Sequence, residues 1–306
     1  MRRFALILFL ALTFAAPGCA GKDAPPPAPP TKAELADQDR RADAAEAVAQ
    51  AMQLFSDNEF VDPEAALEYL DKGLALDPEL ANARYYRATI LLGQGRTDRA
   101  LADLDRVIQA RPDHVRAHFA RGTAYLALGN YKDAARDFTQ VTEEDPTVAE
   151  AFLRRGLCYV NLNRSDEAVD DFTRALAINP ANLEANYNRG MVHLARQEYE
   201  AALSDLTQAY VLDSGNVQLL SARGQALLKL GRFDRAARDY RRATQLEPGR
   251  STLYGLLAEA LAGAGDMDGA IQAAEKAFAL ARAQGDGFLT GQYAEQIRQY
   301  RDKSYP

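Results

Sequence analysis

Apolar residues recur along this chain with the spacing of paired helices. Residues 115–148 hold two apolar sets, which are separated by Gly129-Asn130 and followed by Pro146. The sets are Phe119, Gly122, Tyr125 and Leu126, then Ala134, Phe138 and Val141. Their intervals match one face of a helix, glycine and asparagine favour the left-handed turn that ends a helix, and proline cannot continue one. The segment therefore predicts a helix, a tight turn and a second helix.

The same order of residues returns every 34 positions. The residue that ends each unit is a proline in all cases but one: Pro78, Pro112, Pro146, Pro180, Ser214 and Pro248. An alanine keeps the same period: Ala66, Ala100, Ala134, Ala168, Ala202, Ala236 and Ala270. Such a period is typical of helical hairpins stacked in a row. We expect an all-α solenoid with regular units 81–114, 115–148, 149–182, 183–216, 217–250 and 251–284, preceded by a divergent unit.

We number the residues of each unit from 1 to 34. The residue type is most similar between units at positions 8, 15 and 24. Position 8 is small: Ala88, Gly122, Gly156, Gly190, Gly224 and Ala258. Position 15 favours a turn: Gly95, Gly129, Asn163, Gln197, Gly231 and Gly265. Position 24 is mostly large: Leu104, Phe138, Phe172, Leu206, Tyr240 and Ala274. Small residues at position 8 allow the two helices to approach closely, and the large residues fill the space between hairpins.

This pattern resembles the tetratricopeptide repeat (TPR). The resemblance implies a right-handed superhelical solenoid of about seven helix-turn-helix repeats over residues 33–284, the first of them divergent. Gln197 and Ser214 depart from the pattern in unit 183–216, and we expect a looser turn there.

Both ends of the solenoid depart from the repeat. A capping-box pattern, Thr31-Lys-Ala-Glu34, predicts the start of the first helix. Its expected apolar stripe is Leu35, Ala45, Val48, Met52 and Phe55. Residues 285–306 are expected to form a capping helix and tail, with an apolar face of Phe288, Leu289, Tyr293, Ile297 and Tyr300.

The N-terminus reads as a targeting segment. Arg2 and Arg3 precede an apolar stretch over residues 4–16 that is short for a membrane span, and Ala16-Pro17-Gly18-Cys19 follows. This arrangement resembles the lipobox of bacterial lipoproteins. The resemblance implies a signal peptide over residues 1–18 and lipidation of Cys19. Ala20 and Gly21 form no Asp-type retention signal, so it also implies a location at the outer membrane, facing the periplasm. The alternative is ordinary signal-peptidase cleavage with Cys19 incidental. Residues 19–32 are then a proline-rich linker.

Charge and composition argue against several classes of function. The formal net charge is −7, and we recognise no basic nucleic-acid-binding stripe, so no nucleic-acid partner is expected.

His114 and His118 are four residues apart, which would suit a metal pair, but a solvated or capping role is favoured because no further ligand lies nearby. Cys158 occupies a position held by alanine elsewhere and is expected to be buried and inert. We find no catalytic constellation and expect neither enzyme activity, a metal nor a cofactor.

Charged residues recur at two further positions. Position 7 holds Arg87, Arg121, Arg155, Arg189 and Arg223, and position 23 holds Asp103, Asp137, Asp171, Asp205 and Asp239. Both charges vanish together in unit 251–284, where Leu257 and Ala273 stand. One interpretation is a ladder of arginines that binds acidic ligand groups. The favoured interpretation is a set of structural ion pairs, because the aspartates would neutralise the ladder.

The family resemblance also implies a partner-binding groove on the concave face, lined by positions 2, 5, 9, 12 and 13 of the first helices. The corresponding residues form an apolar strip: Tyr85, Leu92, Phe119, Thr123, Leu126, Leu153, Leu157, Asn161, Tyr187 and Met191, with Val160 and Leu194 beside them. We expect the residues at position 5 to be the anchors, namely Tyr85, Phe119, Leu153 and Tyr187. The alternative is that neighbouring helices or the N-terminal segment cover part of the strip.

Together these features favour a membrane-anchored periplasmic scaffold or adaptor that binds envelope proteins in its groove. The layout resembles NlpI-type lipoproteins, which implies an adaptor for cell-wall enzymes. An assembly factor for a pilus or secretion machine is a second interpretation. An envelope hydrolase is the alternative from another class, and it lacks a reactive polar pocket. The sequence leaves the partner, the organism and the oligomeric state open.

Overall fold

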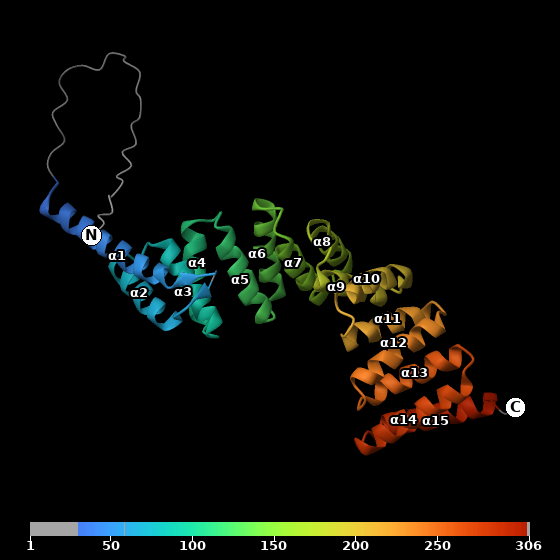
Figure 1. The fold of residues 1–306 in the computed structure, drawn as a ribbon. Coiled ribbons are helices and arrows are strands. Elements are labelled where there is room, and N and C mark those ends of the chain that lie inside the picture. Colours follow the sequence, from blue (N-terminus) through green and yellow to red (C-terminus); the bar gives the residue numbers. More distant parts are fainter. Residues whose placement is uncertain (1–29, 58, 305–306) are drawn as a thin grey trace, which may run out of the picture.

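The computed structural model describes residues 30–57 and 59–304 and shows an all-α protein (Figure 1). Cys19 and nearly all of the predicted signal peptide and linker lie outside the described residues. Of the fifteen helices in these residues, fourteen pack as seven consecutive pairs and the last packs against the final pair, which confirms the predicted fold class. Within the described residues, no helix combines the length and apolar character needed to cross a bilayer.

Each regular unit contains a first helix, called helix A, and a second helix, called helix B. The A helices are α3 (Ala81–Gly93), α5 (Val115–Ala127), α7 (Ala149–Asn161), α9 (Leu183–Ala195), α11 (Val217–Lys229) and α13 (Ser251–Gly263). The B helices are α4 (Thr97–Ala110), α6 (Tyr131–Glu144), α8 (Ser165–Ile178), α10 (Tyr199–Leu212), α12 (Phe233–Leu246) and α14 (Met267–Ala283). The divergent unit comprises α1 (Lys32–Gln53), β1 (Phe55–Ser56), β2 (Glu59–Phe60) and α2 (Pro63–Leu76), and α15 (Gly287–Ser304) ends the row.

The turn between helices A and B has one conformation in all six regular units. Position 15 has a positive φ in each, including 57° at Asn163 and 62° at Gln197. The looser turn expected in unit 183–216 is therefore wrong. Ser214, which stands where other units have proline, also leaves the link between units unchanged. Asp213 accepts a hydrogen bond from the Gly215 N–H at 3.0 Å, and the aspartates in the same place in other units, Asp77 and Asp145, accept the equivalent bond.

The A helices from α3 to α11 form one continuous row. α3 contacts α5, α5 contacts α7, α7 contacts α9 and α9 contacts α11, so successive A helices lie close together while each also packs against its own helix B. Figure 1 shows this row of pairs turning between α9 and α11. The row provides one wall of neighbouring helices that runs through consecutive repeats.

Small residues at position 8 set the distance between paired helices. A Cβ atom added at Gly156 would lie 2.7 Å from the Phe172 ring, and one added at Gly224 would lie 2.7 Å from the Tyr240 ring. Both aromatic side chains are 0% exposed and cannot move aside. Glycine at this position is therefore required by close packing against the aromatic residue at position 24.

We expect Gly156→Ala to lower the free energy of unfolding by about 1–3 kcal/mol, because the added methyl group overpacks the contact with Phe172. Adding Phe172→Leu should recover part of this loss, since unit 81–114 already combines Ala88 with Leu104. Gly93→Ala is the control, because nothing lies within 4 Å of its added Cβ. Chemical denaturation measures all three, and equal effects of Gly156→Ala and Gly93→Ala would contradict the packing explanation.

The first helix, α1, and the last helix, α15, do not bury all of the residues that the sequence predicted. α1 packs against α2 through Ala44, Ala47 and Ala51, whereas Leu35 is 47% exposed and Ala45 is also exposed. The helical period was right and Val48 of the predicted stripe does lie against Gly73 of α2, but the centre of the buried face is shifted to the small residues beside it. In α15, Tyr293 and Tyr300 are buried as expected, but Phe288 is 74% exposed.

Candidate functional site: an apolar strip backed by an ionic network

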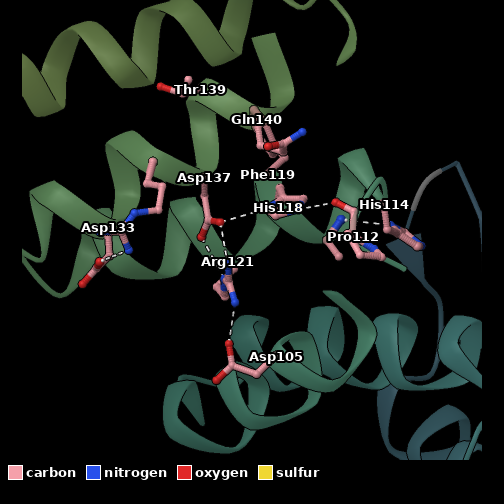
Figure 2. Close-up of polar contacts among 12 residues, drawn as sticks. Asp105, Pro112, His114, His118, Phe119, Arg121, Asp133, Asp137, Thr139 and Gln140 are labelled. Atoms are coloured by element: carbon pink, nitrogen blue, oxygen red, sulfur yellow. Dashed lines mark hydrogen bonds and ion pairs between the residues drawn. The ribbon is translucent and has the colours of Figure 1, made fainter. Parts of the chain in front are cut away.

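The charged residues at positions 7 and 23 meet in every unit that has them. In unit 115–148, Arg121 donates from Nε to Oδ2 of Asp137 at 2.9 Å and from Nη2 to Oδ1 at 2.7 Å (Figure 2). The same two-bond geometry joins Arg87 to Asp103, Arg155 to Asp171, Arg189 to Asp205 and Arg223 to Asp239. The five aspartate side chains are 3–9% exposed. These contacts occupy the guanidinium groups, so they offer no ladder to an acidic ligand.

A third bond from most of these arginines reaches the preceding repeat. Nη1 of Arg121 donates to Asp105 on α4 at 2.7 Å (Figure 2), and Arg87 binds Asp71 on α2 in the same way. In the next two units the acceptors are threonine hydroxyls, Thr139 and Thr142 for Arg155 and Thr173 for Arg189. Each of these four arginines therefore joins its own helix pair to the helix B before it.

Sequence reasoning missed this third partner. Asp71, Asp105, Thr139 and Thr173 all occupy position 25 of the preceding unit, so their polar character at a 34-residue interval was the available signal, whereas Thr142 lies at position 28. Arg223 differs, because its guanidinium lies over the Tyr210 ring at 3.6 Å from the centroid. An aromatic face replaces the polar acceptor there.

His118 extends the network in unit 115–148. Its Nδ1 lies 2.8 Å from Oδ1 of Asp137, and its Nε2 lies 2.8 Å from the Pro112 carbonyl oxygen (Figure 2). Burial acts to raise the pKa of Asp137, but hydrogen bonds from His118 and Arg121 outweigh it and hold that pKa below its usual range. Both ring nitrogens thus face oxygen atoms of the fold, and His118 serves the structure.

The remaining histidines and the thiol also have structural surroundings. His114 caps α5, with Nδ1 accepting from the Ala117 N–H at 3.1 Å, and His193 contacts Glu198. Among the described residues, no group of three or more side chains could hold a metal ion. Cys158 is fully buried, and burial raises the pKa of its thiol to about 12. A thiol with this pKa is almost entirely protonated near neutral pH and is a poor nucleophile.

The predicted groove residues lie along the row of A helices, and most of them reach the surface. Met191 is 37% exposed and the neighbouring Val160 39% exposed. Asn161 is exposed, and the half-buried ones are Tyr85, Leu92, Phe119, Thr123, Leu126, Leu157 and Tyr187. The strip therefore combines rings held partly in the core with aliphatic side chains open to solvent.

Leu153 and Leu194 do not belong to this surface. Leu153 is 1% exposed and packs in a core cluster with Phe152 and Val192. The prediction that Leu153 is a surface anchor is therefore wrong: a leucine is shorter than the aromatic residues at position 5 of other units, and its neighbours enclose it. Leu194 is also buried, at 9% exposure.

Two aromatic residues of the strip, Tyr85 and Phe119, are held by contacts with neighbouring rings. Tyr85 lies 5.3 Å from Tyr86 and 5.3 Å from His114, measured between ring centroids. Phe119 makes an edge contact with the buried Phe138 at 5.7 Å. Such contacts limit rotamer freedom, so these rings lose little entropy on binding a partner.

Arg154 is a groove residue that sequence reasoning missed. Its guanidinium carbon lies 5.7 Å from the centroid of the Phe119 ring on the preceding A helix, and its Nη2 bonds Glu150 at 2.7 Å. Position 6 carries no recurring residue type, so the periodic pattern gave no signal for it. Arg154 adds a cation beside the apolar strip.

Hollows adjoin several of the A helices, and two of them involve the groove or the capping helix. One, of about 390 Å³, is lined by Tyr187, Leu183, Glu184 and residues of α11. A larger one, of about 900 Å³, lies between α13 and α15, where Phe288 and Gln292 face Gly255 and Glu259. The capping helix thus leaves an open hollow beside the last A helix.

Comparison with known proteins identifies the repeat. The family model described as tetratricopeptide repeat matches residues 62–115, 87–148, 119–182, 153–217 and 221–286. No sequence among the curated proteins matches the chain.

Solved structures share the fold at low sequence identity. The crystal structure of MamA protein is 21% identical, with a TM-score of 0.53, over 57% of this chain and 95% of that chain. YrrB, described as a TPR protein with an unusual peptide-binding site, is 21% identical, with a TM-score of 0.55, over 60% of this chain and 94% of that one. A tetratricopeptide repeat protein from Parabacteroides merdae ATCC 43184 is 19% identical, with a TM-score of 0.55, over 85% and 99%.

The matches cover the chain from α2 to the end of α14, and they coincide with the helix pairs and the recurring close contacts described above. The chain belongs to the tetratricopeptide-repeat family.

Proposed function

We propose that this protein is a scaffold that binds protein or peptide segments along its row of A helices. The observation that carries the proposal is the apolar strip in which Val160 and Met191 are exposed, and Tyr187 half-buried, on consecutive A helices. Exposed apolar surface of this kind marks sites where a partner packs. Its solved relative YrrB is described as having a peptide-binding site.

The ionic network supports this function by holding the strip in shape. Arg121 and Arg155 join neighbouring helix pairs, so Phe119 and Val160 keep their relative positions before a partner arrives. A surface that is ordered in advance loses less conformational entropy on binding. The mechanism is positional: the scaffold gathers partners and performs no chemical step itself.

The proposed location is the bacterial outer membrane, with the chain anchored through a lipid on Cys19 and facing the periplasm. The support is the sequence Ala16-Pro17-Gly18-Cys19 behind an apolar stretch and the layout that resembles NlpI-type lipoproteins. The partners are then envelope proteins, including cell-wall enzymes. A role in assembling a pilus or secretion machine uses the same groove and differs only in the partner.

Replacing Cys19 by serine tests the anchor. We expect Cys19→Ser to move the protein from the membrane fraction to the soluble periplasmic fraction, because no acyl chain can then be attached. Cys158→Ser is the matched control and should stay with the membrane. The lipoprotein proposal fails if Cys19→Ser remains in the membrane fraction at the level of the unaltered protein.

Photo-crosslinking in whole cells tests the groove. A photoreactive residue at Val160 or Met191 should capture specific proteins, identified by mass spectrometry, because both side chains open to solvent in the strip. The control places the same residue at Val211, which is 75% exposed on α10, a helix B. Equal capture from Val160 and Val211 would count against the groove as the recognition site.

A further inference from the structure

One helix B carries an unusual excess of positive charge. Five arginines, Arg232, Arg235, Arg238, Arg241 and Arg242, fall at or just before α12, and all five are exposed. None of them forms a salt bridge with a carboxylate among the described residues. The only acidic residues in this stretch are Asp234 and Asp239, and Asp239 is taken up by Arg223. This local concentration of arginines contrasts with the formal net charge of −7 of the whole chain.

The repeat itself explains why α12 is free to carry these charges. Arg241 occupies position 25, where the preceding units offer Asp105, Thr139 or Thr173. The following unit has Leu257 in place of the arginine at position 7, so no guanidinium needs an acceptor there. The arginines are consequently not required by the ionic network that joins the repeats.

An acidic surface lies at the other end of the solenoid. Residues 57–79 contain eight carboxylates and a single lysine, Lys72. Glu64, Glu68 and Asp71 recur at intervals of four and three residues and are exposed on one face of α2. Glu64 and Glu68 form no salt bridge among the described residues, while Asp71 bonds Arg87 through one oxygen.

The charged residues on α2 and α12 have the same spacing along their helices. On α12, Arg235, Arg238 and Arg242 are separated by three and four residues, which also places them on one face. If α2 and α12 lie antiparallel, Glu64 faces Arg242, Glu68 faces Arg238 and Asp71 faces Arg235. Both sets span seven residues, which corresponds to about 10 Å along a helix. Antiparallel helices also place their dipoles in opposite directions.

These helices cannot pair within one molecule. Figure 1 shows α2 near one end of the row of helix pairs and α12 beyond the turn near the other end. Any contact between them must join two copies of the chain. The geometry points to a head-to-tail self-association, in which the arginine face of α12 in one copy binds the acidic face of α2 in the next.

This contact would be heterologous, because each copy uses two different surfaces. Heterologous contacts leave one free α2 and one free α12 at the ends of every open assembly, so assemblies extend into chains unless the two ends meet and close a ring. Such an assembly would bring several copies of the apolar strip together. It does not depend on which partner occupies that strip.

Charge reversal tests the contact. The full chain in a nonionic detergent is followed by sedimentation velocity at an ionic strength of about 0.01 M and of about 1 M, where the Debye lengths are about 30 Å and 3 Å. We expect concentration-dependent assembly at low ionic strength and dissociation at high ionic strength. Arg238→Glu with Arg242→Glu should weaken assembly by about tenfold or more, and Glu64→Arg with Glu68→Arg should do the same.

The decisive variant combines all four changes, which swaps the charges and should restore assembly. The control is Arg99→Glu with Arg106→Glu on α4, because these two exposed arginines also form no salt bridge among the described residues and should leave assembly unchanged. The proposal is overturned if the unaltered chain stays monomeric at low ionic strength or if the fourfold variant fails to reassemble. It is also overturned if reversal on α12 abolishes binding to vesicles of anionic phospholipid while self-association persists, since the face would then belong to a membrane.

Discussion

Replacing Arg155 by alanine should lower the free energy of unfolding by about 3 kcal/mol. The Arg155 side chain is 12% exposed and the Asp171 side chain is 5% exposed, and two hydrogen bonds of 2.7 Å join them. Nη1 of Arg155 also bonds the Thr142 hydroxyl at 2.7 Å. The substitution would leave the Asp171 carboxylate buried without a cationic partner, which is the costly part of breaking such a pair.

The loss should also appear locally, because Arg155 joins α7 to both α6 and α8. In a solenoid each repeat contacts only its neighbours, so amide hydrogen exchange should become faster in α6, α7 and α8 before it does in α13. Arg136→Ala is the control: its pair with Asp133 lies on the surface, at 78% and 37% exposure, and its removal should cost less than about 1 kcal/mol. Similar losses from Arg155→Ala and Arg136→Ala would show that the buried pairs do not stabilise the stack.

The sequence predicted the repeat and its internal contacts because both depend on periodic local rules. Glycine at position 8 and a large residue at position 24 recur because one must leave the space that the other fills, as at Gly156 and Phe172. The simultaneous loss of charge at Leu257 and Ala273 indicated that positions 7 and 23 touch. A period of 34 residues therefore carries information about contacts within one unit.

Features that depend on the particular neighbours of one residue, and not on the repeated pattern, were harder to predict. Leu153 occupies an anchor position by register, but its burial depends on the sizes of Phe152 and Val192 around it. The contact of Arg121 with Asp105 crosses between units, and its acceptor changes to Thr139 in the next one. At the N-terminus no repeat determines which face of α1 is buried, so the helical period was right, whereas Leu35 and Ala45 of the predicted apolar face are exposed and Val48 packs as predicted.

Introducing charge into the apolar strip should abolish partner capture with little loss of stability. Val160→Asp together with Met191→Asp places two carboxylates on consecutive A helices, at side chains that are 39% and 37% exposed. A partner that packs apolar groups there would have to bury these charges. Central interface residues often contribute 2 kcal/mol or more, which corresponds to about a thirtyfold loss of affinity.

These two residues test recognition better than the aromatic ones. Phe119 contacts the buried Phe138, so its truncation would disturb the core as well as the surface. Val211→Asp with Leu212→Asp is the matched control, because these residues are 75% and 43% exposed and, like Val160, lie near the C-terminal end of a helix. Crosslinked partners are quantified by mass spectrometry, and stability by chemical denaturation. If Val160→Asp with Met191→Asp captures partners at full strength, recognition lies elsewhere, and the hollow between α13 and α15, with Phe288 at its edge, becomes the surface to test.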